Sequence, residues 1–471
     1  MHGLQSKCNQ ESDAQTTLME QPGLPPHRPR GTLRSHDPLH ALTFGCGQGP
    51  WVWDTAGKRY LDLICGYSAC NLGHAHPALV AAATSQLQQL TFAHGGQHPG
   101  RDQLESQLAN IWKQSLLVAP GAHPKESGMD ANAGETTSGD PPIQVWLSTT
   151  GARAIEVAWK LACTYRPGGV ARFDLAYHGR SLATSLITDT RRSQVHFDHS
   201  DENVVIPFPI ACECDVDLPL AAISSECCEA CQLSLDIANE RLGRWAVDLS
   251  FLVVEPAIGS RGYYFASPEF HRRLVRLSRE HGLLVISDEI QMGLGRLGPM
   301  IVGNEDGWEP DLVVLGKSLG GGIVPISAVL GRADILDRLG EGIESETFAA
   351  SPLACRIASC VLEELSSPCL LEESVQMGKN FRERLRERLP RQLSIRGRGM
   401  ATALGLEAWG PNGAAVAHGW VHALSHSGVL AHLTGSNRDR IALLPPLNVS
   451  ASLLEDTIDA LERTLPSRLA V

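Results

Sequence analysis

Short apolar segments alternate with amphipathic stretches through the middle of the chain. The apolar segments are rich in Val, Ile and Leu and are bounded by polar residues or glycine. This pattern is typical of strands that are buried on both faces of a sheet. It predicts five strands, at Ile143–Ser148, Ala171–Ala176, Phe251–Val254, Leu283–Ser287 and Leu312–Leu315.

The stretches between these strands predict helices. After the first strand, Ala154, Ala158 and Leu161 fall on one helical face, and Pro268–His281 has a helical pattern that leads into the Leu283 strand. Alternation of strands and helices predicts an α/β fold with a mainly parallel sheet. Ligands of such sheets bind at the carboxyl ends of the strands. The residues that follow each apolar segment are therefore the candidates for function.

The composition narrows the class of protein. The formal net charge of -12 disfavours nucleic acid and anionic membranes as partners, because both need a basic surface. No apolar run approaches the roughly 20 residues that span a bilayer. The N-terminus has no signal pattern and carries acidic residues, and the 13 cysteines suit reduced thiols. We expect a cytoplasmic protein, with a disordered arm at residues 1–36 and an inserted loop at residues 118–143.

Two strand ends suit an anion and a flat ring. Thr149-Thr150-Gly151-Ala152 follows the first strand and opens a helix, whose free N–H groups can bind a phosphate. A plain helix N-cap would have the same pattern. Tyr177 and His178 follow the second strand, where an aromatic ring can stack on a heterocycle or simply be half-buried.

Two further strand ends carry charge. Asp288 closes a buried strand, and a buried carboxylate needs a cationic partner such as a pyridinium N–H. Gln291, three residues later, can donate to a phenolate oxygen. Lys317 follows the last strand and precedes three glycines, a position that packing alone does not explain. A desolvated lysine has a lowered pKa and forms a Schiff base with an aldehyde.

Two other motifs are assigned no function. Gly293–Gly298 matches the dinucleotide pattern GxGxxG, but no acidic residue closes a following strand at the required spacing. Five cysteines form a CxC followed by CCxxC, a spacing that permits a structural zinc site. Because the regular glycines of zinc knuckles are absent, we interpret them as reduced loop thiols and expect no metal. These residues are Cys212, Cys214, Cys227, Cys228 and Cys231.

Taken in order, these motifs resemble those of the class III aminotransferases, a family of pyridoxal-phosphate (PLP) enzymes of fold type I, and among them the ornithine-type enzymes. The resemblance covers roughly residues 40–465. The fold it implies has a large PLP-binding domain at residues 101–344 and a smaller α+β domain built from residues 37–100 and 345–471. The matching stretches are GYSACNLGHAHP (66–77), TGA (150–152), YHG (177–179), VVEP (253–256), SDEIQMGLGRLG (287–298), LGKSLGGG (315–322), ESETFAASPLAC (344–355) and PPL (445–447).

The resemblance implies a role for each matching residue. Lys317 would hold PLP covalently and act as acid and base, and Asp288 would keep the pyridine nitrogen protonated. Tyr67 and Arg180 would bind the amino-acid substrate, with Arg180 gripping its carboxylate. Homodimers with shared active sites are also implied, in which Thr347 reaches the phosphate of the partner's cofactor. The remaining cofactor-binding residues would be Thr150, Gly151, Ala152, Tyr177, His178, Glu255 and Gln291.

Four positions depart from the resemblance. Ala152 lacks the phosphate-binding hydroxyl of many relatives, and Arg153 replaces a glutamate. Ser260 and Ala442 stand where ornithine-type enzymes carry a glutamate and an arginine that form a gating ion pair. This joint loss predicts poor handling of glutamate and 2-oxoglutarate, unless Arg261 or Arg440 replaces the missing arginine.

The predicted function is PLP-dependent transamination of an amino acid, with the ω-amine of a basic amino acid as donor and a keto acid as acceptor. Another PLP reaction on the same fold, such as decarboxylation, racemisation or elimination, is the main alternative. A protein that binds PLP without turnover is the third.

Overall fold

The computed structural model describes residues 42–94, 96–118, 141–189, 203–214, 216, 226–340 and 342–466. The predicted N-terminal arm and nearly all of the predicted inserted loop lie outside these residues. Within them, no helix has the length and apolar character that a membrane span requires.

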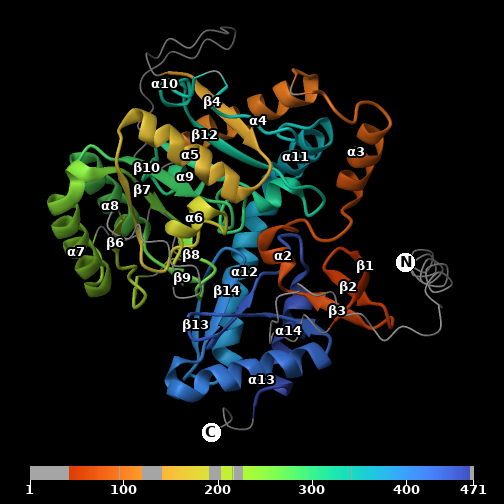
Figure 1. The fold of residues 1–471 in the computed structure, drawn as a ribbon. Helices are drawn as coiled ribbons and strands as arrows, with labels where there is room; N and C mark the ends of the chain where they lie inside the picture. Colours follow the sequence, from red (N-terminus) through yellow and green to blue (C-terminus); the bar gives the residue numbers. More distant parts are fainter. Residues whose placement is uncertain are drawn as a thin grey trace, which may run out of the picture.

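A seven-stranded sheet forms the centre of the fold (Figure 1). β12 is antiparallel to both of its neighbours, and the other adjacent pairs are parallel. The predicted, mainly parallel α/β sheet is thus confirmed. In spatial order its strands are β4 (Ile143–Ser148), β12 (Ser327–Arg332), β11 (Leu312–Leu315), β10 (Leu284–Asp288), β7 (Leu249–Val254), β5 (Gly169–Phe173) and β6 (Asn203–Ile206).

The five predicted strands are all present, with small differences in their bounds at β7 and β10 and a larger one at β5. β5 ends at Phe173 rather than Ala176. Its continuation turns away because the Ala176 N–H donates to the Phe173 carbonyl, while Asp174 accepts the Phe208 N–H at 3.0 Å. The turn brings Tyr177 to the end of the sheet.

Helices cover both faces of this sheet, because alternate strand residues point to opposite sides. On β11, Leu312 and Val314 pack with α5, whereas Val313 and Leu315 pack in the cluster that contains α4 residues. Helix α8 ends at Glu280, and Gly282 takes a left-handed φ of 73° directly afterwards. The covering helices are α4 (Pro99–Val118), α5 (Gly151–Tyr165), α7 (Glu229–Trp245), α8 (Pro268–Glu280) and α11 (Pro352–Leu365).

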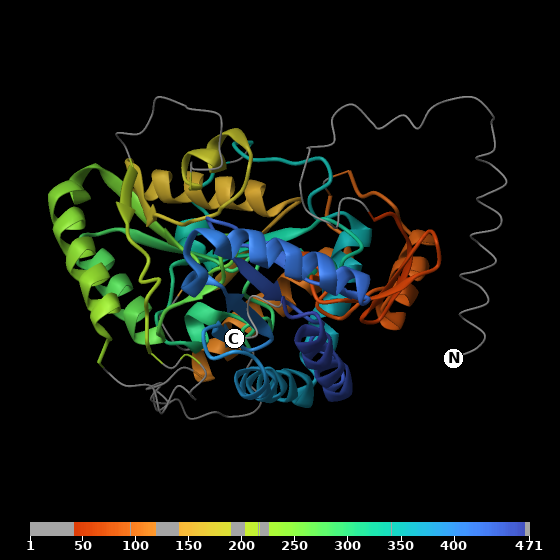
Figure 2. The same cartoon turned by 90° about the horizontal axis from the view of Figure 1, so that it is seen from below.

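Two smaller sheets combine segments far apart in the sequence. β15 (Val429–Leu430) pairs in parallel with β3 (Arg59–Asp62) in the order β1–β2–β3–β15, where β1 is Phe44–Gln48 and β2 is Trp51–Asp54. The second sheet has the order β13 (Ser394–Arg398), β14 (Ala401–Gly405), β17 (Arg440–Leu443), β16 (His432–Thr434). Seen from below in Figure 2, the blue C-terminal helices lie across the base of the molecule. The division at residues 37–100, 101–344 and 345–471 stays a prediction.

Shorter elements and the C-terminal helices complete the chain. A short ribbon pairs β8 (Ala257–Ile258) with β9 (Tyr264–Phe265). The helices are α2 (Cys65–Ser68), α3 (Pro77–Leu87), α6 (Leu182–Leu186), α9 (Val302–Glu305), α10 (Ala333–Leu336), α12 (Pro368–Arg388), α13 (Gly413–His426) and α14 (Ala451–Arg463), with 3-10 turns at η5 (Ala246–Asp248), η6 (Lys317–Gly320) and η7 (Glu407–Asn412).

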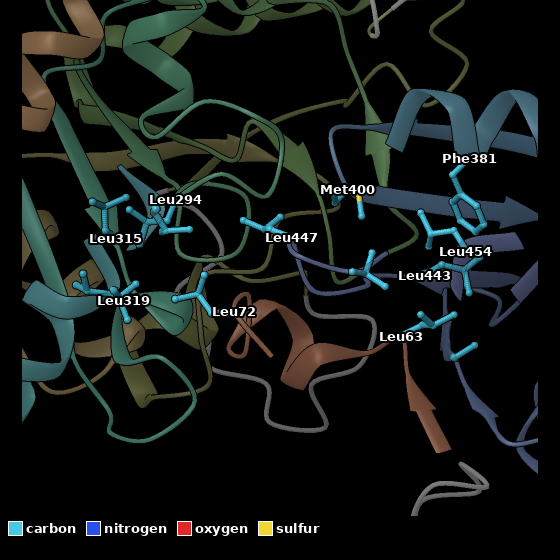
Figure 3. Close-up of a cluster of buried hydrophobic side chains, with 14 of the residues drawn as sticks. Leu63, Leu72, Leu294, Leu315, Leu319, Phe381, Met400, Leu443, Leu447 and Leu454 are labelled. Carbon is cyan, nitrogen blue, oxygen red and sulfur yellow. The ribbon is translucent and has the colours of Figure 1, made fainter. Parts of the chain in front are cut away.

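One apolar cluster joins the central sheet to the C-terminal segments. Leu315 and Leu319 lie at one end of it and Phe381 and Leu454 at the other, with Leu72 and Leu447 between them (Figure 3). Because burial of apolar surface is worth about 25 cal/mol per Å², this continuous core fixes the N- and C-terminal segments against the loop that follows β11.

Candidate active site

Three charged side chains lie at the ends of adjacent strands. β10 closes with Asp288, Glu255 follows β7, and Lys317 follows β11 after one glycine. β10 pairs with both neighbours, with Ser287 opposite Val254 and Asp288 opposite Val314. The sheet register therefore brings the three predicted groups to one edge of the sheet.

Asp288 is held by a buried histidine. Its Oδ2 lies 2.8 Å from His178 Nδ1, and its Oδ1 accepts the Ile290 N–H at 3.2 Å. Asp288 is only 5% exposed. The His178 backbone N–H donates to Thr188 Oγ1 at 3.0 Å, which fixes the turn that carries the ring. His178 Nε2 is buried without a hydrogen-bond partner among the described residues, so the ring's polar edge is satisfied only toward Asp288.

Lys317 has the properties of a reactive amine. Burial lowers the pKa of its ammonium to about 8, and the nearby carboxylates of Asp288 and Glu255 oppose that shift only in part. Its backbone takes a left-handed φ of 45°, a conformation that costs energy for a non-glycine residue. A lysine with this pKa is about one tenth neutral amine at pH 7, far more than an ordinary lysine.

Glu255 lies beside Asp288 and supports the turn before it. Glu255 Oε1 accepts the Tyr177 N–H at 2.8 Å. Burial, and then the neighbouring carboxylate of Asp288, raise the pKa of Glu255 well above its usual range. Neighbouring buried carboxyl groups disfavour a charge on both, and here the raised pKa favours the neutral form of Glu255.

The turn after β4 has the features of an anion cradle. Thr150 is the N-cap of α5, and its Oγ1 accepts the Arg153 N–H at 3.3 Å. A Cβ added at Gly151 would lie 2.7 Å from Ile290 Cδ1, so only glycine permits this approach. A cavity of about 480 Å³ opens here, lined by Thr149, Thr150, Ala152, Arg153, Glu156, Ser181, Glu346, Thr347 and Phe348.

Thr347 and Arg153 also lie at this cavity, but neither adds a free positive charge to it. Thr347 lines this cavity within the same chain, and whether it serves the partner's cofactor stays a prediction. Arg153 forms ion pairs with Glu156 and Glu344. Arg153 thus neutralises acidic side chains at the cavity instead of adding free positive charge to it.

The predicted substrate residues lie beside the sheet edge. The Arg180 guanidinium lies 5.7 Å from the centre of the Tyr177 ring, and its side chain is exposed. Tyr67 is 40% exposed and meets the His432 ring edge-on at 4.7 Å. Gln291 Nε2 donates to the Tyr67 carbonyl at 3.4 Å, which ties the substrate end to the strand ends.

Three residues of this region, Tyr263, His432 and Asp189, were not predicted from the sequence. Gln291 Nε2 also donates to the hydroxyl of buried Tyr263 at 2.9 Å, and His432 packs on Tyr67. Asp189 pairs with Arg261 at 3.2 Å. The Gly-Tyr-Tyr run after Arg261 was the available signal for Tyr263, whereas the other two pairings depend on chain crossings that no local pattern indicates.

The positions of Ser260 and Ala442, where the resemblance leads us to expect a gating ion pair, are filled by packing. Ala442 is fully buried in an apolar cluster with Tyr263 and Leu444. Ser260 Oγ is buried and has no hydrogen-bond partner among the described residues. Arg440 forms an ion pair with Glu407, and its guanidinium lies 4.3 Å from the centre of the Tyr264 ring. Neither Arg440 nor Arg261 therefore occupies the position as an uncompensated cation.

Comparison with known proteins agrees with this geometry. The family profile described as aminotransferase class-III matches residues 33–465. The chain belongs to the class III aminotransferases. It is similar to the ornithine aminotransferase of Bordetella pertussis, with 30% identity over 87% of each chain. It is also 32% identical to the 5-aminovalerate aminotransferase of Pseudomonas aeruginosa over 74% of each chain.

A solved structure supports the fold assignment as well. An ornithine aminotransferase from Toxoplasma gondii, described with PLP partly occupying its active site, superposes with a TM-score of 0.73. The identity is 25%, and the match covers 93% of this chain and 92% of the other. This class III aminotransferase is thus a PLP-dependent transaminase of fold type I. The names of its relatives refer to different amino acids, so the activity that these relatives share is amino-acid transamination.

The described residues fit PLP. A phosphate needs unpaired N–H donors, an aldehyde needs an amine, and a protonated pyridine nitrogen needs a buried anion. The start of α5, Lys317 and Asp288 offer these three groups. His178 Nε2, a buried polar atom without a partner among the described residues, belongs to the imidazole that holds Asp288.

Proposed function

We propose that this transaminase takes the amino group from the ω-carbon of an amino acid that also carries a carboxylate, with Lys317 as the residue that binds PLP and moves the proton. The main support for this proposal is that Lys317, Asp288 and Glu255 lie at one edge of the sheet. Arg180, which is exposed, follows the turn that Glu255 holds. When bound, PLP supplies an electron sink for the carbon that loses its proton.

Each residue at the sheet edge has a defined task in this proposal. Asp288 would place its carboxylate next to the pyridine nitrogen, and His178 holds the orientation of that carboxylate through the 2.8 Å contact. Tyr177 would lie against the ring, and Gln291 would have to release Tyr67 or Tyr263 to donate to the phenolic oxygen. Thr150, Gly151 and Ala152 would hold the phosphate, mainly through backbone N–H groups because Ala152 has no hydroxyl.

Lys317 would carry the proton from the substrate carbon that bears the amino group to the cofactor carbon on the other side of the nitrogen. Its pKa of about 8 suits an ε-amine that takes up a proton and gives it back at ordinary pH. The left-handed backbone and the glycines that follow leave the side chain close to the sheet edge. Lys317 itself is partly exposed, whereas Leu315, Ser318 and Leu319 on either side of it are buried.

Arg180 and Tyr67 select the substrate. A guanidinium binds a carboxylate through two parallel N–H···O bonds, and the Tyr177 ring beneath Arg180 limits its freedom. In this proposal the substrate carboxylate binds Arg180 while the amino group reaches Lys317, which calls for an amine that carries its carboxylate several bonds away. The names of the relatives, ornithine and 5-aminovalerate aminotransferases, agree with such a chain length.

We further propose a homodimer in which Thr347 reaches the partner's phosphate, and a keto acid other than 2-oxoglutarate as acceptor. Exposed Thr347 and Phe348, which is 66% exposed, provide a surface for the first proposal. The apolar packing of Ala442 supports the proposal on the acceptor, because this position has no arginine to bind the second carboxylate of 2-oxoglutarate.

The test is a matrix of donors and acceptors. Purified enzyme with PLP is incubated with ornithine, 5-aminovalerate, 4-aminobutyrate and alanine against pyruvate, glyoxylate and 2-oxoglutarate, and amino products are quantified by mass spectrometry. We expect transfer from the first three donors at rates well above alanine. Transfer only from α-amines, or loss of carbon dioxide without transfer, contradicts the proposal.

A further inference from the structure

Four cysteine side chains converge far from the sheet edge that carries Lys317. The Sγ atoms of Cys212, Cys214, Cys228 and Cys231 all lie within 4.8 Å of one another. Cys212 and Cys214 follow β6, and Cys228 and Cys231 begin α7. In the sheet order, β10, β7 and β5 separate β6 from β11, so this cluster does not belong to the candidate active site.

We propose that Cys212, Cys214, Cys228 and Cys231 form a structural zinc site that joins the end of β6 to the start of α7. Zinc binds four thiolates tetrahedrally at about 2.3 Å, which places neighbouring sulfurs about 3.8 Å apart. Cys231 Sγ and Cys212 Sγ are 3.5 Å apart, and the other pairs stay within 4.8 Å. All four cysteines are free thiols, so no disulfide accounts for their approach.

The surrounding backbone supports negative charge on these sulfurs. The Glu213 N–H donates to Cys228 Sγ at 3.5 Å. Zinc knuckles commonly use glycines for such contacts, and this chain has none at the corresponding positions. Here the Glu213 N–H supplies a donor of the same kind.

Two positive features offset the charge of four thiolates. Cys228 is the N-cap of α7 and Cys231 lies in its first turn, where the helix dipole favours anions. Arg396 from β13 donates to the carbonyls of Cys212 and Ile210, at 2.9 Å and 3.2 Å. The same arginine connects the cluster to the C-terminal sheet.

The geometry favours one ion in a closed, structural site. Cys212 is 5% exposed and Cys231 is 0% exposed, and both belong to the apolar cluster between α7 and the sheet. Four protein ligands leave no position for a substrate or water, as in structural rather than catalytic zinc sites. Clusters of several irons would hold thiolates farther apart than these sulfurs are.

Metal analysis of the full-length holoenzyme tests the proposal. Protein from zinc-supplemented cells, purified without a metal-binding tag, should contain about one zinc per chain by mass spectrometry. Cys214→Ser with Cys228→Ser should lose more than about 90% of it and lower the melting temperature by about 5 °C or more, while PLP absorbance remains. Wild-type protein with no metal, with iron in place of zinc, or with a disulfide among these cysteines overturns the proposal.

Cys227 provides the matched control. It is adjacent to Cys228 but outside the group of four sulfurs, so Cys227→Ser should keep about one zinc per chain. Zinc loss in Cys227→Ser with retention in Cys228→Ser would overturn this ligand set. Should the double variant not fold, cobalt exchange into wild-type protein still decides, because tetrahedral cobalt bound by four thiolates has intense d–d bands that other geometries lack.

Discussion

The sheet edge around Lys317 and the wall, by which we mean Ser260 and Ala442, differ in charge. At the sheet edge, buried Asp288 and partly buried Lys317 are ionisable groups. At the wall, where the family resemblance leads us to expect an ion pair, the chain has a buried hydroxyl at Ser260 and apolar packing at Ala442. Removing one partner of a buried pair leaves an uncompensated charge that costs about 3–5 kcal/mol, whereas replacing both can be neutral.

The contrast separates chemistry from substrate choice. Groups that act on the cofactor cannot change without loss of the reaction, because each acts on an atom that every transamination involves. Residues that bind the second carboxylate of an acceptor can be lost when the enzyme uses an acceptor without that carboxylate. We therefore expect mutations at the sheet edge to lower all reactions and mutations at the wall to alter only the choice of acceptor.

The largest effect is expected for Lys317→Ala. The variant lacks both the covalent anchor and the proton carrier, so turnover with every donor should fall by about 10⁴-fold or more. Borohydride treatment of wild-type protein should attach the cofactor to Lys317, as read by peptide mass spectrometry. Attachment to a different lysine would refute the assignment, and Lys160→Ala, a lysine paired with Glu344, is the control that should keep activity.

Asp288→Ala should have the next largest effect. Without the carboxylate, the pyridine nitrogen loses its anionic partner, and turnover should fall by about 10³-fold while the fold persists. His178→Asn, which keeps a donor near Asp288, should lower turnover by only about tenfold because it affects orientation alone. The cofactor's visible spectrum and the melting curve show whether PLP is still bound. Near-normal turnover of Asp288→Ala would exclude the proposed role.

Arg180→Ala should discriminate between donors. Ornithine and 1,4-diaminobutane differ by the carboxylate that Arg180 is proposed to bind. Loss of a bidentate, charge-assisted contact should lower kcat/KM for ornithine about 100-fold, mainly through KM, and leave the diamine nearly unchanged. Arg180→Lys should recover part of the loss, since a lysine keeps the charge but not the bidentate geometry. Equal losses for both donors would mean that Arg180 does not contact the carboxylate.

A smaller, graded effect is expected when pH is varied. Cofactor-free enzyme binds PLP covalently only through the neutral amine of Lys317, whose pKa is lowered to about 8. The ammonium form predominates below this pH, so the rate of covalent binding should rise about tenfold per unit from pH 6 to 8 and then level off. Stopped-flow absorbance measures the rate. A rise that continues past pH 10 would indicate an ordinary, solvated lysine.

Local patterns predicted the fold and the strand ends well. Each apolar segment became a strand, and Asp288 and Lys317 followed from their positions after those segments, because a buried strand fixes the residue at its end. Contacts between distant segments were out of reach. Nothing near Asp288 in the sequence indicates His178 as its partner, and Arg440 gave no sign of its pairing with Glu407. The spacing of the cysteines was recognised in the sequence, but whether they bind zinc depends on how closely the fold brings the four sulfurs together.

The smallest effects concern the candidates for a replacement arginine. Arg261 is paired with Asp189 and Arg440 with Glu407, so each already serves a carboxylate of the protein. The enzyme in its pyridoxamine form should therefore react slowly with 2-oxoglutarate. Arg440→Ala should change that rate by less than about threefold, because a side chain that contacts neither the substrate nor the transition state does not affect the rate. Rapid mixing with 2-oxoglutarate and with pyruvate gives the two rates. A fast reaction at low 2-oxoglutarate that disappears in Arg440→Ala would show that this arginine exchanges Glu407 for the substrate.

Glu407→Gln then sharpens the test. If Glu407 masks the guanidinium, its neutralisation should speed the reaction with 2-oxoglutarate and leave the rate with pyruvate unchanged. If the pair is purely structural, neither rate should change, while the melting temperature should change slightly.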